Sequence, residues 1–336
     1  MTSIAFFNNK GGVGKTTLAC NFAAHLARDK GQRVVVVDCD PQANATQLLL
    51  DDNSWEAIYE DRVASGERTV LRALRDIRAG DSTVVADVEL HRADRFQVQV
   101  IAGHPSLSIV EDQLSSSWGE FLAKRLGGVR RSLWVRQLVR ALHAQGDVFL
   151  FDLGPSLGAL NRSVLMGCDF FVTPVAADLF SLYALENIGE WLRLWLDEYE
   201  EAHGRLVASN PAVAEDFDVP VKLPIAQGWS GYSVQQYVAK STAGKLRGVM
   251  AYDRYRNQIP DRAARLEGLK APDLVFLELG IVPNMFSMVP LAQAAHAPVV
   301  DLRPADGVRG AQVTQQGRYV EQLTEMFERL CTNINL

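Results

Sequence analysis

The stretch that decides the fold reads Asn8-Asn9-Lys10-Gly11-Gly12-Val13-Gly14-Lys15-Thr16-Thr17. It follows the apolar run Ile4-Ala5-Phe6-Phe7 and precedes a helix-like pattern, which predicts a strand, a loop and a helix in that order. The glycines let backbone N–H groups approach a phosphate chain without obstruction by Cβ atoms. A helix that begins near Lys15 points its positive dipole end at the same anion. The stretch therefore predicts a phosphate-binding loop.

Two side chains of this loop have predicted chemical roles. Lys15 is placed to neutralise phosphate oxygens, and the Thr16 hydroxyl is placed to ligate Mg²⁺. The general pattern G-x-x-x-x-G-K-[ST] is not met in full, because Asn9 stands where its first glycine would be. The loop carries a second lysine, Lys10, directly after that position.

With this departure the loop resembles the deviant Walker A motif of the ParA/MinD family of ATPases. The resemblance implies that ATP and Mg²⁺ are bound by Lys10, Gly11, Gly12, Val13, Gly14, Lys15, Thr16 and Thr17. It also implies an ATP-dependent homodimer in which Lys10 crosses the interface and reaches the partner's nucleotide. Lys10 and Lys15 would then both take part in catalysis.

The composition fits a globular chain with a sizeable core. The chain has 336 residues, 48% of them hydrophobic, and we expect one elaborated domain over residues 1–336. A formal net charge of −6 argues against a protein whose whole surface coats nucleic acid. Any contact with DNA would have to be a local patch.

The cysteines and the N-terminus indicate where the protein works. The four cysteines (Cys20, Cys39, Cys168 and Cys331) are far apart, so neither a disulfide framework nor a zinc site is expected. The N-terminus has no signal-peptide pattern, and no uncharged apolar run reaches the ~18 residues of a membrane span. We therefore expect a soluble, cytoplasmic protein.

A second polar cluster, Asp38-Cys39-Asp40-Pro41-Gln42, follows a predicted buried strand of valines at 34–37. Functional residues of open α/β sheets gather at the carboxyl ends of strands, where Asp40 would face the terminal phosphate. The cluster resembles the family's D-x-D-P-Q signature, which implies that Asp40 is catalytic and orients the attacking water. The alternative is that Asp38 and Asp40 only cap a turn, and for Asp38 both interpretations stay open.

The apolar run Val148-Phe149-Leu150-Phe151 ends in Asp152 and precedes Leu153-Gly154-Pro155-Ser156. This pattern indicates a Walker B strand, with Asp152 holding Mg²⁺ through a coordinated water, because Mg²⁺ gives up its water shell reluctantly. The family commonly has D-x-P-P-S at this point. Since Gly154 replaces a proline, we expect a looser loop with metal binding retained.

Residues 51–146 are less regular. Apolar positions at 55–59 and 70–74 predict short helices, 96–101 alternates like a strand, and the segment 51–95 is expected to form an inserted lobe.

Between positions 121 and 146 there are six basic residues and no acidic one. The predicted helix in this run buries Trp134, Leu138, Ala141 and Leu142 and directs Arg136 and Arg140 outward. The basic run is either a solvated face or a contact for DNA or an acidic partner.

The resemblance continues through a strand at 170–175 and a helix from Ser181. Trp191 and Trp195 on that helix either pack in the core or line a groove for a partner. Residues 219–225 predict the next core strand, and 232–245 predict the helix that follows it.

Two later positions concern the adenine base. Family members place an adenine-contacting residue just after the strand expected at 219–225, which falls ambiguously on Ala226 or Gln227, so this contact is unassigned. The stretch Gly280-Ile281-Val282-Pro283-Asn284 resembles the family's strand-end I-P-R segment. This resemblance implies that Pro283 lies beside the adenine.

A second basic stretch lies at 240–270, with eight basic and three acidic residues. Related proteins bind DNA non-specifically through basic residues in their C-terminal half, and such contacts reach phosphates without reading sequence. The candidate DNA contacts are Lys240, Lys245, Arg247, Arg254 and Arg256. The alternative is a solvated basic insertion at 229–275.

The last predicted helix, 313–330, has an apolar side formed by Val320, Leu323, Phe327 and Leu330. MinD-like proteins end in a basic amphipathic helix that binds membranes. Here acidic residues share the helix, so we expect it to pack against the sheet and expect no membrane contact.

These patterns together predict a doubly wound, mostly parallel α/β sheet with P-loop topology. By resemblance, the protein is a ParA-type switch that dimerises on ATP, hydrolyses it to ADP and phosphate, and segregates or positions DNA on the nucleoid. A ParB-like adaptor would stimulate it. Two alternatives remain: a switch that positions a protein cargo without DNA, and an ATP-dependent metabolic enzyme on the same fold.

Overall fold

An eight-stranded sheet forms the centre of the molecule, with strand order β3-β4-β2-β5-β1-β6-β7-β8. The computed structural model describes residues 1–336 except 61–63, 210, 213–215, 218, 236–246 and 286. Every neighbouring pair of strands is parallel except β3 with β4. The strands are β1 (Thr2–Phe6), β2 (Val34–Asp38), β3 (His91–Ala93), β4 (Val98–Ile101), β5 (Val148–Asp152), β6 (Phe170–Ala176), β7 (Trp229–Gln235) and β8 (Glu278–Val282).

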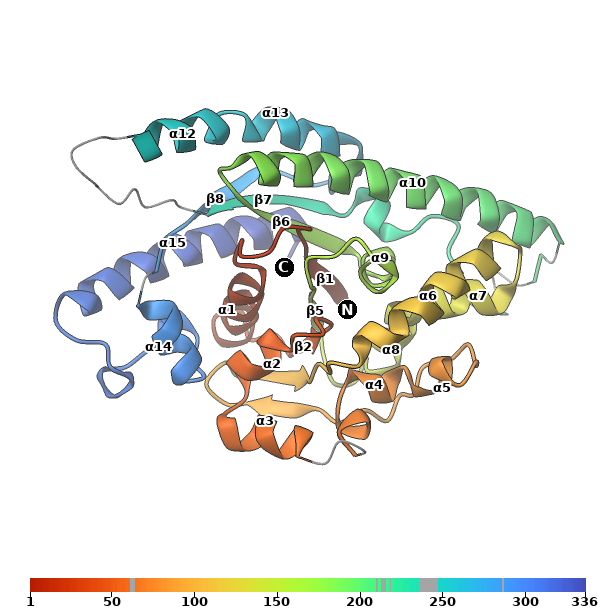
Figure 1. The fold of residues 1–336 in the computed structure, drawn as a ribbon, viewed down its shortest axis with the longest axis horizontal. Coiled ribbons are helices and arrows are strands. Elements are labelled where there is room, and N and C mark those ends of the chain that lie inside the picture. The colour runs from red at the N-terminus through yellow and green to blue at the C-terminus, as the bar shows by residue number, and fades with distance from the viewer. Residues whose placement is uncertain (61–63, 210, 213–215, 218, 236–246, 286) are drawn as a thin grey trace.

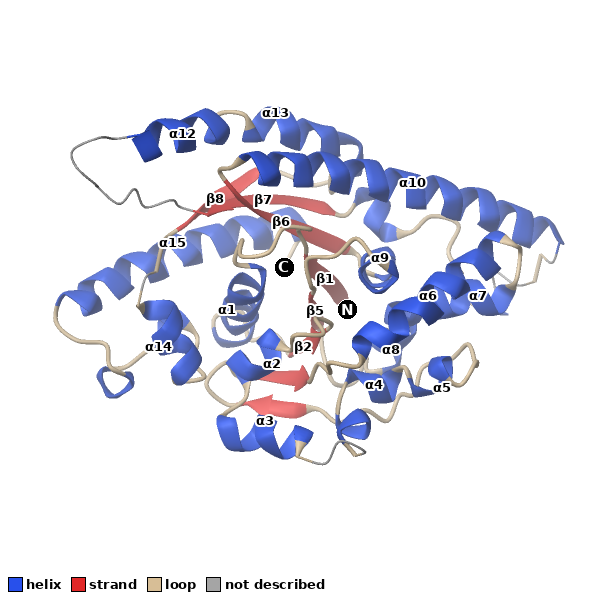
Figure 2. Cartoon of the chain, viewed as in Figure 1, coloured by secondary structure: helices blue, strands red, loops and turns tan. Residues whose placement is uncertain are grey.

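Helices cover both faces of the sheet (Figures 1 and 2). The helices are α1 (Lys15–Arg28), α2 (Asn44–Leu49), α3 (Asp52–Tyr59), α4 (Val70–Ala73), α5 (Arg75–Arg78), α6 (Leu107–Leu122), α7 (Leu126–Ser132), α8 (Trp134–Ala141), α9 (Ala159–Gly167), α10 (Leu179–Ser209), α12 (Arg247–Arg256), α13 (Ile259–Ala263), α14 (Met288–Ala294) and α15 (Ala311–Ile334). Short 3₁₀ segments lie at Ser65–Arg68, Pro224–Gln227, Ala264–Leu269, Val299–Asp301 and Pro304–Asp306. The predicted doubly wound α/β architecture is confirmed.

Unbroken apolar strands suit a sheet that is buried on both faces. Side chains alternate along a strand, so Ile4 and Val36 join one core cluster with α1, α14 and α15. Ala5 and Val37 join the other cluster, with α6, α8, α9 and α10. Figure 1 shows these two groups of helices on opposite sides of the central strands.

The parallel register brings the ends of the central strands to one edge. Phe6, the last residue of β1, lies opposite Asp152, and Asp38, the last residue of β2, lies opposite Asp152 from the other side. The loop that follows β1 and the acidic ends of β2 and β5 therefore meet, although they lie far apart in the sequence.

The strand expected at 219–225 is misplaced in the prediction. The core strand is β7 at Trp229–Gln235, and Pro224–Gln227 forms a 3₁₀ turn before it. The helix expected at 232–245 is wrong in its first part, which is strand, and its remainder lies outside the described residues. Proline restricts the earlier run, whereas residues 229–234 of β7 are all buried, as expected of a strand inside a sheet.

The predicted helices at 134–142 and 181 onward are present as α8 and α10. Trp134, Leu138 and Leu142 are buried, but Ala141 is exposed, because α8 ends there. On α10, Trp195 is buried in the core and Trp191 is exposed.

The C-terminal helix α15 packs against β7, β8 and α1, as predicted. Its apolar side chains, including Leu323 and Phe327, belong to the core cluster on that face. In the described part of the chain, no helix combines the length and the apolar character that crossing a bilayer requires.

The segment 51–95 contributes α3, α4, α5 and β3 at the β4 edge of the sheet. Its side chains enter the cores on both faces, Ile58 on one side and Val70 and Leu71 on the other. The interpretation of this segment as an inserted lobe stays a prediction.

Candidate nucleotide site

The loop between β1 and α1 is open where a phosphate chain would lie. Gly12 and Gly14 have φ values of +74° and +83°, a region that side-chain-bearing residues rarely adopt. A Cβ atom added at Gly11 or Gly12 would meet nothing within 4 Å. The first turn of α1 has no side-chain cap and no acidic residue, so its N–H groups remain available to an anion.

Asn8 and Asn9 occupy the start of the loop, in the region where the general motif has its first glycine. Asn8 is buried, and its Nδ2 donates to Pro174 O on β6 at 2.7 Å, while its Oδ1 accepts from Lys10 N at 2.8 Å. These bonds tie the loop to β6. The Oδ1 atom of Asn9 is buried and has no hydrogen-bond partner among the described residues.

The two lysines of the loop have different environments. Lys15 is 7% exposed, and its Nζ donates to Lys10 O at 3.0 Å. Burial lowers the pKa of Lys15, and the nearby carboxylates of Asp152 and Asp40 only partly oppose this shift. Lys10 is more exposed, and its Nζ forms an ion pair with Asp178 in the turn before α10.

Asp152 and Thr16 form the second element of the site. The Thr16 hydroxyl donates to Asp152 Oδ2 at 2.7 Å. Asp152 is fully buried, and its Oδ1 has no hydrogen-bond partner in the described ranges. Burial raises the pKa of Asp152, and the nearby carboxylates of Asp38 and Asp40 raise it further. A cation at this carboxylate would relieve the cost of burying its charge.

Asp38 and Asp40 differ in their bonds. Asp38 accepts from Thr46 N at 2.8 Å, Thr46 Oγ1 at 2.7 Å and Asp40 N at 3.1 Å, so its oxygens hold the turn into α2. Burial raises the pKa of Asp38 to about 6, against these hydrogen bonds. Asp40 accepts from Gln42 N at 3.0 Å and is 8% exposed. A Cβ atom added at Gly154 would lie 3.2 Å from Asp40 Oδ1, so Asp40 faces the loop after β5.

That loop, residues 153–158, is hydrogen-bonded to α9, and the expectation of a looser loop stays a prediction. The buried amide of Asn161 donates to Gly154 O at 2.8 Å and to Ser156 O at 2.7 Å. Hydrogen bonds from α9 thus restrain the position where the family commonly has a proline.

Sequence analysis missed Gln235 at this site. It is the last residue of β7, and its Oε1 lies 3.2 Å from the place of a Cβ atom at Gly14. This oxygen is buried without a hydrogen-bond partner in the part of the chain that the structure describes. The misplaced strand prediction concealed this residue, and the alternation of Tyr232 and Val234 with Ser233 and Gln235 is the signal that could have found it.

The remaining predicted residues are Pro283 and the basic residues of 240–256, of which the structure describes only a part. Pro283 follows β8, the strand next to β7. Lys240 and Lys245 lie outside the described residues, and Arg247 begins α12. Arg254 is exposed, whereas Arg256 forms an ion pair with Glu278 on β8.

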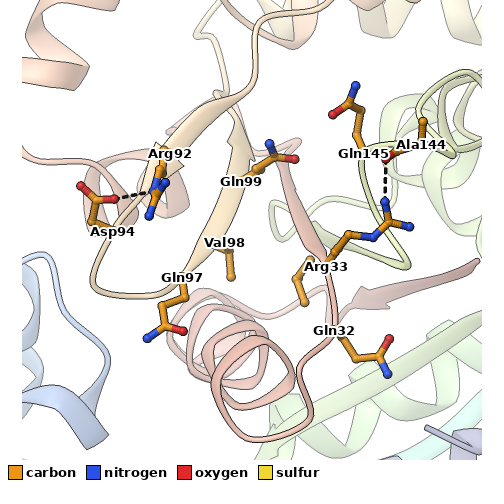
Figure 3. A pocket seen from close by; sticks show the side chains of 10 residues that line it. Gln32, Arg33, Arg92, Asp94, Gln97, Val98, Gln99, Ala144 and Gln145 are labelled. Atoms are coloured by element: carbon orange, nitrogen blue, oxygen red, sulfur yellow. Dashed lines mark hydrogen bonds and ion pairs between the residues drawn. The ribbon is translucent and has the colours of Figure 1, made fainter.

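A separate cleft of about 640 Å³ lies at the opposite, amino ends of β2 and β4 (Figure 3). Its two arginines are already paired. Arg33 pairs with Asp147 at 2.7 Å, and Arg92 pairs with Asp94 at 2.6 Å. This cleft is not part of the site around Lys15.

The site residues fit a magnesium-bound nucleoside triphosphate. The glycine cradle has room, and Lys15 is a buried ammonium. Asp152 has a buried oxygen beside the Thr16 hydroxyl that no described residue hydrogen-bonds. Two protein ligands are enough for Mg²⁺, because this ion keeps several of its bound waters. Fold and site therefore define an α/β P-loop nucleotide-binding protein.

Comparison with known proteins narrows this class. Residues 1–202 match the AAA_31 family, described as an AAA domain. The chain belongs to the ParA/MinD family of P-loop ATPases.

Relatives were found among curated proteins and solved structures. The cell division protein PomZ of Myxococcus xanthus is 31% identical over 185 residues, or 55% of this chain and 49% of that protein. The chromosome partitioning protein ParA of the same organism is 30% identical over 55% of this chain and 56% of its own length. This chain thus spans about half the length of these relatives. The crystal structure of protein DIP2308 from Corynebacterium diphtheriae is 38% identical, covers 88% of this chain and 97% of its own, and has a TM-score of 0.75.

Proposed function

We propose that this protein binds Mg-ATP, hydrolyses it to ADP and phosphate, and uses this cycle as a dimerisation switch that segregates or positions DNA. The observation that carries the proposal is the convergence of Lys15, Thr16, Asp40 and Asp152 on an open glycine loop at one edge of the sheet. The family, which includes proteins named for chromosome partitioning, supports the same function.

Each residue has a proposed role. The N–H groups of residues 10–17 and the Lys15 ammonium hold the phosphates, while Thr16 and Asp152 hold the metal ion. Mg²⁺, when bound, would supply positive charge against the phosphate oxygens. Asp40 orients the attacking water, because phosphoryl transfer depends on placement and charge stabilisation more than on covalent help.

Two residues at the ends of β7 and β8 are proposed to contact the adenine base. Gln235 presents a buried oxygen beside Gly14 that has no partner among the described residues, which makes it a candidate for the contact that sequence alone left unassigned. Pro283, after the neighbouring strand β8, is a second candidate.

Lys10 is proposed to act on the partner subunit's nucleotide in an ATP-dependent homodimer. Its side chain is 29% exposed, so it can leave the ion pair with Asp178 without crossing the core. A charge delivered in trans accelerates phosphoryl transfer by roughly 10³ to 10⁵ in systems that use one. Slow basal turnover that an adaptor of the ParB type stimulates is the expected consequence.

Non-specific DNA binding is proposed for the basic stretch that includes α12. Arg254 is the best-placed described candidate because it is exposed, and Lys240, Lys245 and Arg247 extend the same stretch. Arg256 contributes less, since Glu278 already neutralises it. We further propose one domain over 1–336 and a cytoplasmic protein that associates with the nucleoid in its ATP state.

The test is the solution mass of the Asp40→Ala protein, by light scattering, with and without Mg-ATP, followed by DNA binding at two salt concentrations. A mass that doubles only with Mg-ATP, with salt-sensitive DNA binding by the dimer, supports the proposal. A dimer that does not bind DNA would favour a switch that positions a protein cargo. One of the similar proteins, PomZ, is named as a cell division protein, which is consistent with this alternative. The absence of an ATP-dependent dimer would refute the role of Lys10, and a product beyond ADP and phosphate would favour a metabolic enzyme.

A further inference from the structure

The loop at residues 153–158 connects the metal-binding strand β5 to α9 and touches the catalytic candidate Asp40. A Cβ atom added at Gly154 would lie 3.2 Å from Asp40 Oδ1 and 3.4 Å from its Cγ. The backbone at Gly154 is therefore packed against this carboxylate. Any movement of the loop toward or away from β2 changes the space in which the Asp40 carboxylate sits.

One side chain is hydrogen-bonded to two backbone carbonyls of this loop. Asn161 is 2% exposed and lies in the first turn of α9. Its Nδ2 donates to Gly154 O at 2.8 Å and to Ser156 O at 2.7 Å, and it also lies 3.3 Å from Ser156 Oγ. A single amide group thus links two carbonyls of the loop, and in a buried setting these bonds are costly to lose.

Asn161 extends from a helix whose start is fixed by its neighbours. The carboxylate of Glu111, on α6, accepts hydrogen bonds from Ala159 N and Leu160 N, the latter at 3.0 Å. A Cβ atom at Gly158 would lie 1.8 Å from Glu111 Oε1, so a side chain here would displace the end of the Glu111 side chain. The N-terminus of α9 is therefore held firmly against α6.

The next residue along α9 anchors the helix to two others. The Arg162 guanidinium lies 4.6 Å from the ring centre of Trp118 on α6 and 5.8 Å from that of Trp195 on α10. Cation–π contacts of this kind are stronger when shielded from water, and both indoles are nearly buried. The helix that carries Asn161 is thus held by contacts with both α6 and α10.

We propose that Asn161 is a positioning residue for ATP hydrolysis: by holding the carbonyls of Gly154 and Ser156, it fixes the loop against which Asp40 orients the attacking water. This proposal rests on the proposed hydrolytic function. Asn161 does not touch the phosphate loop in any described contact, so it acts on the placement of Asp40 and not on nucleotide binding.

The experiment compares Asn161→Ala with a matched control on the same helix. The control is Ser163→Ala, which removes the buried hydrogen bond from Trp134 Nε1 to Ser163 Oγ at 2.9 Å but leaves the loop intact. The measurements are kcat for ATP hydrolysis, Kd for a non-hydrolysable ATP analogue with Mg²⁺, and Tm. We expect Asn161→Ala to lower kcat by about 10- to 100-fold, because small misplacements of reacting groups have effects of this size. We expect Kd to stay unchanged, and Ser163→Ala to keep the wild-type kcat.

A second variant guards against misfolding of the first. Asn161→Leu fills nearly the same buried volume but cannot donate to the carbonyls of Gly154 and Ser156, and it should lower kcat in the same way with an unchanged Kd.

Wild-type kcat in both Asn161→Ala and Asn161→Leu, with ATP hydrolysis by the wild-type protein intact, would overturn this proposal alone. An equal loss of kcat in Ser163→Ala would also overturn it, because the effect would then be general to α9. A wild-type protein that does not hydrolyse ATP would overturn the proposed function and this proposal with it.

Discussion

Lys10 and Asp178 form an ion pair within one chain, at the turn that opens α10. Asp178 also accepts a hydrogen bond from Ser181 N at 3.0 Å, so it caps the start of that helix. If Lys10 serves the partner's nucleotide, this pair must break before the dimer closes. Partly exposed pairs of this kind contribute about 0.2–1 kcal/mol.

The variant Asp178→Asn should therefore favour the dimer. Asparagine still caps the helix but no longer holds the Lys10 ammonium, so we expect ATP-dependent dimerisation to tighten by up to about fivefold. The measurement is the dimer dissociation constant of the Asp40→Ala protein with Mg-ATP, by analytical ultracentrifugation. Weaker dimerisation in this variant would mean that Asp178 serves the interface itself.

Among the elements, α15 shows how a terminal helix becomes part of the core. The Phe327 ring lies 5.4 Å from Phe22 and 5.6 Å from His25, both on α1. Phe327 is 4% exposed. To enter a membrane, this apolar side of α15 would have to detach from α1 and the sheet.

Phe327→Ala should lower the free energy of unfolding by about 3–5 kcal/mol, because it removes a buried ring between two helices. The control on the same helix is Val313→Ala, whose side chain is 52% exposed, and which should change stability by less than about 0.5 kcal/mol. Urea denaturation of both variants checks this prediction. Equal, small effects would indicate that α15 is loosely attached.

The helix α12 carries a second element-scale prediction, on DNA. Arg254→Glu should keep the stability of the wild type and weaken DNA binding with Mg-ATP, and it should reduce the salt slope of binding by about one. Arg256→Glu should instead lower stability by about 1–2 kcal/mol, because it places a second carboxylate beside Glu278. Fluorescence anisotropy at several salt concentrations and thermal melts separate the two effects. Wild-type DNA binding by Arg254→Glu would exclude this patch.

At the scale of the whole molecule, the sheet order decides the site. Strands β2, β5 and β1 are neighbours, so the ends of three distant segments converge at one edge, and β6 and β7 bring Asp178 and Gln235 to the same edge. The site of one chain is open toward solvent at Lys10 and Asp178, whose side chains are partly exposed. A second copy of the chain is the proposed cover.

Dimerisation should make thermal stability depend on protein concentration. With Mg-ATP, the Tm of the Asp40→Ala protein should rise as its concentration rises, because only the folded dimer is favoured by mass action. Without nucleotide, or after removal of Mg²⁺ with EDTA, the Tm should not vary with concentration. A concentration-independent Tm in Mg-ATP would contradict the dimer.

Local sequence patterns predicted those strands and loops whose glycine content or apolar runs are distinctive. Local composition was sufficient to predict the glycine loop, the valine strand before Asp38 and the apolar strand before Asp152. The apolar side of α15 was sufficient to predict that this helix packs against the sheet. These patterns also placed Thr16 and Asp152 in one site, where the structure has them hydrogen-bonded at 2.7 Å. The roles assigned to these residues still await the measurements above.

Long-range packing decided the rest. The strand β7 was missed because its serines and Gly231 give it a weak local pattern, and it is strand only because β6 and β8 pair with it on both sides. The restraint that Asn161 places on the loop, the pairing of Arg256 with Glu278 and the approach of Gln235 to Gly14 join residues that share no local pattern. Sequence alone predicted which chemistry the chain carries, because backbone propensity and hydrophobic period are local. Only the tertiary structure decided which groups hold that chemistry in place, because such contacts depend on how distant elements pack.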